Sequence, residues 1–227
     1  MYNARVLVSH PHRFIYTKTV KTGGTSVESY FERFCMPPGE WSQSHLRDEH
    51  VSDFGIVGVR AAVPPPGCRY WNHMPAQLIR ERVGEAVWGS YFKFCVVRNP
   101  YDKVVSAFYY FQRLEQRAFT SMADEQARLE RWLQSAAHAL PIDRDKYLID
   151  GAFCLDGVLR YETLPADLER LCARLGLPYE PAWLPRFKTG TRPQHGVTRE
   201  LYTEKARQIV AAAFAFELAH FNYSFPA

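Results

Sequence analysis

The chain alternates short apolar runs with stretches in which apolar residues recur at helical spacing. Residues 14–17 and 92–97 are the clearest apolar runs, and their aromatic and β-branched residues favour buried strands. The same reading predicts helices over 25–34, 74–83, 100–117, 123–140, 165–175 and 199–221, and further strands at 5–9, 54–59, 147–149 and 158–161. Alternating strands and helices predict an α/β fold with a mostly parallel central sheet covered by helices on both faces.

The first strand ends in a turn that carries several phosphate-binding features. Its sequence is Lys21-Thr22-Gly23-Gly24-Thr25-Ser26, directly before the first predicted helix. The N–H groups at a helix start lack partners, the helix dipole favours anions, and glycines let the backbone approach a phosphate. The lysine precedes the glycine pair, unlike the Walker A pattern G-x-x-x-x-G-K-[ST]. Taken alone, the turn is equally consistent with an ordinary strand-to-helix connection.

The strand at 92–97 leads into a second turn with different chemistry. Arg98 ends the strand, Asn99 and Pro100 suit the cap and first position of a helix, and Ser106 follows near its second turn. Arg98 and Ser106 are therefore expected to reach one anion, for which the planar guanidinium is well suited. Ligands of such folds bind beyond the carboxyl ends of the strands, so the two turns are expected to face one crevice.

Together the two segments resemble the signature segments of sulfotransferases that use 3′-phosphoadenosine-5′-phosphosulfate (PAPS). Lys-Thr-Gly-Gly-Thr-Ser resembles the 5′-phosphosulfate loop, and Arg-Asn-Pro-x-Asp-x-x-x-Ser resembles the 3′-phosphate segment. The pair is most similar to the carbohydrate (type 2) sulfotransferases and their short bacterial members, from about residue 14 to the C-terminus, with a poor match over 37–69. The resemblance implies a P-loop-like three-layer sandwich that transfers a sulfuryl group to an acceptor hydroxyl, with a carbohydrate or glycoconjugate favoured.

The resemblance also implies roles for the residues of both turns. By analogy with phosphoryl transfer, Lys21 is expected to neutralise the charge that develops on the departing 5′-phosphate. The backbone of 22–25 and the hydroxyls of Thr25 and Ser26 are expected to hold that phosphate. Arg98 and Ser106 are expected to hold the 3′-phosphate, which distinguishes PAPS and its product, adenosine 3′,5′-bisphosphate, from ATP.

The acceptor hydroxyl needs a base, and histidine has a suitable pKa. His73 is the first candidate because its segment, Asn-His-Met-Pro-Ala, resembles the one that carries the catalytic histidine in type 2 enzymes. A surface or capping role is nearly as consistent with its position. His45 and His50 in the acceptor loop are rivals, and His195 is an alternative neighbour of the cofactor.

Two loops are expected within one sulfotransferase domain over 1–227. Residues 37–71 are rich in proline and are the predicted acceptor region. Residues 185–198 carry Lys188 and Arg192, a basic segment predicted to fold over the nucleotide, although a solvated loop would have the same composition.

Composition narrows the class of protein further. Hydrophobic residues make up 47% of the chain, which excludes disorder, and the net charge of +4 is too small to indicate nucleic-acid binding. The five cysteines are widely spaced, which favours reduced thiols and no metal site. No stretch resembles a signal peptide or a membrane span, so we expect a cytoplasmic enzyme with a small-molecule or glycan acceptor.

Two other functions fit parts of the pattern. A P-loop nucleotide kinase or NTPase shares the strand-loop-helix unit but would need the Gly-Lys-Ser/Thr sequence and a magnesium-binding aspartate. A catalytically silent nucleotide-binding protein of the same fold is the third possibility. The acceptor and the oligomeric state are not predicted by any pattern in the chain.

Overall fold

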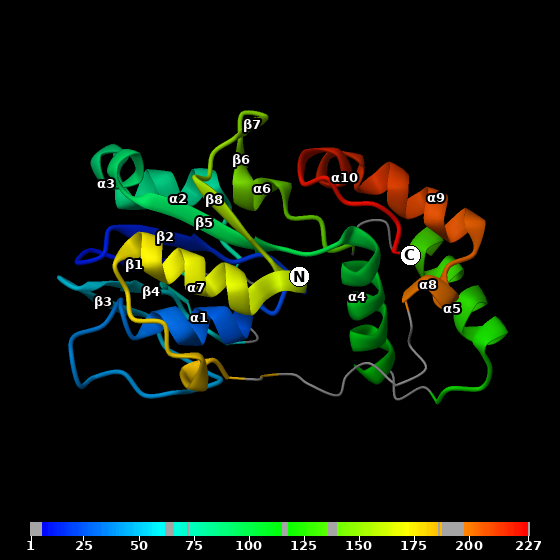
Figure 1. Ribbon diagram of the computed structural model, residues 1–227, viewed down its shortest axis with the longest axis horizontal. Coiled ribbons are helices and arrows are strands. Elements are labelled where there is room, and N and C mark those ends of the chain that lie inside the picture. Colours follow the sequence, from blue (N-terminus) through cyan, green and yellow to red (C-terminus); the bar gives the residue numbers. More distant parts are fainter. Residues whose placement is uncertain are drawn as a thin grey trace. The chain divides into compact units, whose positions relative to one another are not determined.

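The computed structural model describes residues 6–61, 66–71, 73–114, 118–135, 140–185, 187 and 198–226 (Figure 1). The chain separates into two compact units. The first comprises Met1–Val97 with Asp143–Phe187, and the second comprises Arg98–Ile142 with Lys188–Ala227. The single domain expected over 1–227 stays a prediction.

The first unit is built on a mixed six-stranded sheet. Its strands are β1 (Val6–Ser9), β2 (Phe14–Thr17), β3 (His50–Ser52), β4 (Gly55–Val57), β5 (Phe92–Val97) and β8 (Gly157–Arg160), in the order β3-β4-β1-β2-β5-β8. β5 pairs in parallel with β2 and with β8, whereas β1 is antiparallel to β2 and β4, and β3 to β4. The sheet was predicted to be mostly parallel, but among its described strands only the pairs β2-β5 and β5-β8 are parallel. The four residues between β1 and β2 allow only a hairpin, because a parallel connection needs a long crossover.

Helices cover both faces of this sheet. On one face, α1 (Gly24–Glu32) and α7 (Leu164–Leu175) pack on side chains that include Leu7, Tyr16 and Phe94 (Figure 1). On the other, α2 (Ala76–Val83) and α3 (Glu85–Ser90) pack on a cluster that includes Val8 and Ile15. Alternate residues of β1 and β2 thus point to opposite faces, and the three-layer arrangement is confirmed for this unit.

The rest of the first unit consists of short elements. The predicted strand at 147–149 is instead the end of α6 (Arg144–Tyr147) followed by β6 (Leu148–Ile149), which pairs with β7 (Ala152–Phe153). Two short turns, η2 (Tyr161–Thr163) and η3 (Pro181–Trp183), precede and follow α7.

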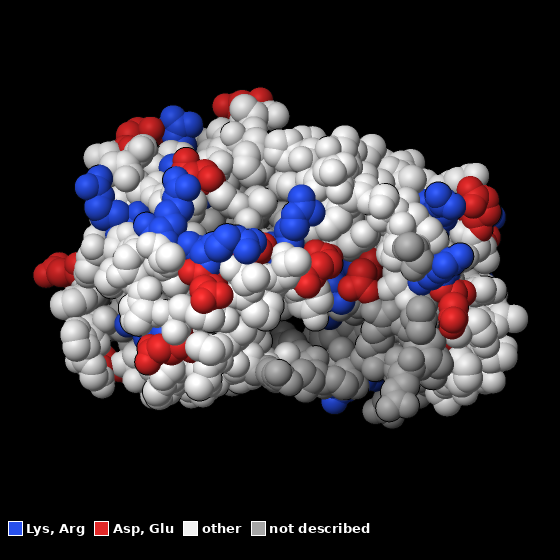
Figure 2. Space-filling model, in the orientation of Figure 1, with Lys and Arg blue, Asp and Glu red and all other residues white. Residues whose placement is uncertain are grey.

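A basic cavity of about 500 Å³ lies beside β8, the edge strand of the described sheet, and is lined by Arg160, Arg170 and Arg174. Figure 2 shows basic side chains gathered over this part of the unit. Asp167 accepts a hydrogen bond from the Arg160 N–H and pairs with Arg170. Arg160 belongs to β8, whereas Arg170 and Arg174 belong to α7. A charged side chain on an edge strand discourages pairing with another chain, which is a structural role for Arg160.

The second unit consists of helices in its described residues. They are α4 (Pro100–Leu114), α5 (Met122–Ser135), α8 (Thr198–Leu201), α9 (Glu204–Ala213) and α10 (Ala215–His220). Val104, Leu129 and Val210 are completely buried in their shared core. The helix predicted over 199–221 is divided into three, because Thr203 caps a new helix by accepting a hydrogen bond from the Ala206 N–H. No helix in the described ranges of the chain has the length and apolar content that a membrane span requires.

Candidate functional site

The turn between β2 and α1 has the geometry expected of an anion-binding loop. Lys21 (φ 59°) and Gly23 (φ 73°) both adopt the left-handed conformation, and the backbone reverses sharply before α1. The Gly23 carbonyl accepts from the Ser26 N–H at 3.0 Å, but no side chain caps the helix and its first turn contains no acidic residue. The first turn of α1 itself therefore contains no carboxylate that would neutralise the positive dipole at its N-terminal end.

Aromatic rings surround the two glycines of this turn. A Cβ at Gly23 would lie 3.1 Å from the Tyr161 ring, and one at Gly24 would lie 3.0 Å from the Tyr16 hydroxyl. Two features therefore favour glycine at position 23: a Cβ there would crowd the Tyr161 ring, and the backbone φ is positive. The glycines were predicted from the sequence, whereas no sequence pattern indicated Tyr161, which begins η2 directly after β8.

Buried polar groups hold the turn between β2 and α1 in place. Both carboxylate oxygens of Asp143 accept from the Val20 N–H, at 2.9 and 3.1 Å, and Asp143 is completely buried. The Thr22 hydroxyl is buried 2.8 Å from the Thr19 hydroxyl, which donates to the Val96 carbonyl. The Thr22 side chain therefore supports the loop from inside, and Asp143, which no sequence pattern indicated, fastens it to the segment before α6.

His73 lies beside the same loop. Its Nδ1 is 2.9 Å from the Lys18 carbonyl oxygen, which can only accept, so Nδ1 carries the proton and Nε2 is the basic nitrogen. Burial lowers the pKa of His73 well below its ordinary value of 6.5, and the nearby positive charge of Lys18 lowers it further. His73 has a positive φ of 57°, an uncommon backbone conformation for a residue with a side chain.

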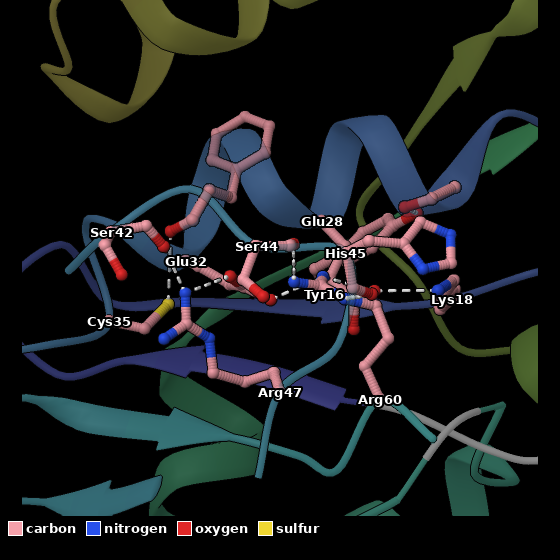
Figure 3. A network of polar contacts seen from close by, with 12 residues as sticks. Tyr16, Lys18, Glu28, Glu32, Cys35, Ser42, Ser44, His45, Arg47 and Arg60 are labelled. Carbon is pink, nitrogen blue, oxygen red and sulfur yellow. Dashed lines mark hydrogen bonds and ion pairs between the residues drawn. The ribbon is translucent and has the colours of Figure 1, made fainter. Parts of the chain in front are cut away.

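A buried network of five charges lies next to His73 and the loop (Figure 3). Lys18 Nζ is 2.7 Å from Glu28 Oε2, and Arg60 Nη1 contacts both Glu28 Oε2, at 3.1 Å, and Glu32 Oε1, at 2.5 Å. Arg47 Nη2 is 3.3 Å from Glu32 Oε2. Burial raises the pKa of Glu32, although the charge of Arg60 acts in the opposite direction. The sequence analysis missed this network.

The network holds part of the predicted acceptor region against α1. Arg60 donates from Nε to the His45 carbonyl at 2.7 Å and from Nη2 to the Ser44 carbonyl at 2.6 Å. The exposed His45 ring lies edge-to-face with Phe187 at 5.3 Å, and the Phe187 N–H donates to Ser26 Oγ at 3.3 Å. His45 stays a rival of His73, whereas Nε2 of His50 is buried and has no hydrogen-bond partner among the described residues.

In the second unit, Arg98 lies just before α4 and Ser106 lies within it. Arg98 Nε donates to Asp102 Oδ2 at 2.7 Å, and Asp102 Oδ1 accepts from the Thr198 hydroxyl at 2.6 Å. Asp102 therefore fixes the orientation of the guanidinium. Ser106 is one helical turn beyond Asp102 and is half-buried.

The predicted residues are distributed over both units. Lys21, Thr22, Gly23, Gly24, Thr25, Ser26 and His73 come together in the first unit around the N-terminus of α1, and Arg98 and Ser106 belong to the second. Lys188, Arg192 and His195 lie outside the described residues. Within the described parts of the chain, no group of three or more His, Cys, Asp or Glu side chains is arranged to hold a metal ion.

Comparison with known proteins identifies the family. The chain matches the model of a family described as the sulfotransferase family over residues 4–224, which confirms the resemblance seen in the two turns. A protein of Archaeoglobus fulgidus described as uncharacterized is 30% identical over 111 residues, which cover 47% of this chain and 86% of that protein. No solved structure matches the chain.

Proposed function

Because this chain belongs to the sulfotransferase family, we propose that it transfers the sulfuryl group of PAPS to an acceptor hydroxyl. A carbohydrate or glycoconjugate is the favoured acceptor class, since the two turns are most similar to those of type 2 enzymes. The uncapped N-terminus of α1, with Lys21 in the turn before it, carries the proposal. It supplies backbone N–H groups, a helix dipole and a full positive charge where a 5′-phosphate needs them.

In the proposed reaction, the sulfur–oxygen bond to the 5′-phosphate breaks as the acceptor oxygen bonds to sulfur. The leaving phosphate gains negative charge, and Lys21 lowers the barrier if its contact strengthens at that moment. The acceptor proton passes to Nε2 of His73, whose tautomer is set by the Lys18 carbonyl. The lowered pKa of His73 keeps this nitrogen unprotonated near neutral pH.

Arg98 is proposed to bind the 3′-phosphate, with Ser106 of α4 as a hydroxyl donor to the same group. Asp102 supports this role because it orients the guanidinium through Nε. A planar, oriented guanidinium is suited to two oxygens of one phosphate. Lys188 and Arg192 remain proposed as further phosphate contacts.

Calorimetry of the wild-type chain with adenosine 3′,5′-bisphosphate and with AMP tests the proposal. The two ligands share the 5′-phosphate and differ in the 3′-phosphate, so we expect a clear preference for the bisphosphate. Equal affinity for the two would contradict the proposed donor. Magnesium-dependent hydrolysis of ATP, measured in parallel, would favour an NTPase instead.

A further inference from the structure

The second unit contains a cavity with no role in the proposed reaction. It lies between the C-terminal half of α4 and α5 and has a volume of about 230 Å³. Its lining includes Phe108, Phe111, Gln112, Arg131, Trp132 and Ser135.

Three aromatic rings form the apolar wall of this cavity. The Trp132 ring lies 6.0 Å from Phe108, at an interplanar angle of 55°, and 6.0 Å from Phe111, at 39°. Phe108 is almost fully buried, whereas Phe111 and Trp132 are half-buried. Aromatic rings pair best when offset or tilted, so this arrangement suits a further planar ring.

Gln112 contributes a buried amide side chain to the cavity lining. Arg128, another lining residue, donates from Nη2 to Gln112 Oε1, and a guanidinium cannot accept, so the orientation of the amide is defined. Gln112 is only 8% exposed, and its Nε2 has no partner in the part of the chain that the structure describes. That nitrogen is also inaccessible to solvent, so the amide shapes the cavity wall and is not a donor to a ligand.

The charges at the cavity favour an anion. Arg128 is already neutralised, with Nη1 2.7 Å from Glu125 Oε1. Arg131 is exposed and forms no ion pair among the described residues. Its positive charge therefore remains available at the cavity.

From these observations we propose that this cavity, between α4 and α5, binds a small aromatic acid. The ring would pack among Phe108, Phe111 and Trp132, and the carboxylate would bind Arg131. The site is distinct from the predicted phosphate contacts on the same helix. At 1.5 Å of rise per residue, Gln112 is about 9 Å along the axis of α4 from Ser106 and about 18 Å from Pro100, where the helix begins after Arg98.

Calorimetry with benzoate tests the proposal on the complete chain. We expect saturable binding that is tighter than that of benzyl alcohol, which lacks the charge, and of cyclohexanecarboxylate, which lacks the planar ring. Arg131→Gln should weaken benzoate binding about tenfold, as expected for one charge-assisted contact. Ser135→Phe, a change at an exposed lining position, should abolish it by filling the cavity.

Arg113→Gln is the matched control, because Arg113 is exposed on α4 and does not line the cavity. Thermal unfolding of each variant establishes that it is folded. The proposal is overturned if wild-type protein shows no saturable binding, or if cyclohexanecarboxylate binds as tightly as benzoate. It is also overturned if Arg131→Gln and Ser135→Phe bind normally, or if Arg113→Gln loses as much affinity as Arg131→Gln. Binding should persist with saturating adenosine 3′,5′-bisphosphate, and competition would assign benzoate to the nucleotide site instead.

Discussion

At the scale of single residues, Lys21 is the proposed source of charge for the departing phosphate. Lys21→Ala should lower kcat by about 10²- to 10³-fold, the range found when one donor to a developing oxyanion is removed. The affinity for substrates should change much less, because the contact matters most in the transition state. Steady-state kinetics separates the two effects, and an unchanged kcat would exclude Lys21 from the chemistry.

His73 should determine the acidic limb of the pH–rate profile. Because burial and the neighbouring Lys18 lower its pKa well below 6.5, kcat/KM should stay constant as the pH falls to 6.5 and decline only below it. His73→Ala should reduce activity by about 10²- to 10⁴-fold, as for loss of a general base. Full activity in that variant would transfer the role to another group, with exposed His45 the first to test.

The same pKa also links His73 to stability. The unfolded chain takes up a proton near pH 6.5, before the folded protein does, so the contribution of neutral His73 is complete above that pH and is lost as the pH falls below it. The free energy of unfolding of His73→Gln should therefore decline less than that of the wild type between pH 7 and pH 5. Urea unfolding across this range provides the measurement, and parallel declines would show that His73 does not titrate as described.

Gly23 combines backbone strain with a steric limit. Gly23→Ala should cost about 1–2 kcal/mol for its positive φ alone, and more because the new Cβ would lie 3.1 Å from Tyr161. Gly39→Ala is the matched control, since Gly39 also has a positive φ but has no neighbour within 4 Å of the Cβ position. Urea unfolding should rank Gly23→Ala as the more destabilised variant. An equal loss in both would mean that Tyr161 moves aside without cost.

At the scale of elements, sequence patterns identify units that are encoded locally. The apolar runs, the glycine pair and the Asn99-Pro100 cap lie within a few residues of the structure they determine, and β2, β5, α1 and α4 form where predicted. The contact between Asp143 and Val20 spans 123 residues and leaves no local signal.

Glu28 and Glu32 carry a signal that the sequence analysis did not use. They stand four residues apart on one helix, and like charges at this spacing repel unless cations lie between them. In the structure, the two buried carboxylates pair with Lys18, Arg60 and Arg47, whose positive charges offset this repulsion.

The network fastens α1 to the end of β2 and to the segment that carries His45. Glu28→Gln should destabilise the fold by about 3–5 kcal/mol, because it leaves Lys18 and Arg60 buried with one charge fewer to balance them. Glu85→Gln is the control, since its pair with Arg80 is largely exposed and should contribute far less to stability. Urea unfolding at pH 7 measures both variants, and a similar loss in the two would contradict a structural role for the network.

At the scale of the whole molecule, nucleotide binding should stabilise the folded state. A ligand that binds only the folded state stabilises it by about 2.7 kcal/mol at one hundred times its Kd. Adenosine 3′,5′-bisphosphate should therefore raise the free energy of unfolding more than AMP at equal concentration. Lys21→Ala should reduce the effect of both nucleotides, because both carry the 5′-phosphate.

Arg98→Ala should behave differently, because the proposed partner of Arg98 is the 3′-phosphate that AMP lacks. Its stabilisation by the bisphosphate should fall to the level of AMP, while its stabilisation by AMP should match that of the wild type. Urea unfolding of the three proteins with each nucleotide separates these cases. If Arg98→Ala reduced both effects equally, Arg98 would support the fold or the 5′ end rather than bind the 3′-phosphate. The preference for adenosine 3′,5′-bisphosphate over AMP would then have to depend on other residues, and Ser106, Lys188 and Arg192 would be the next to substitute.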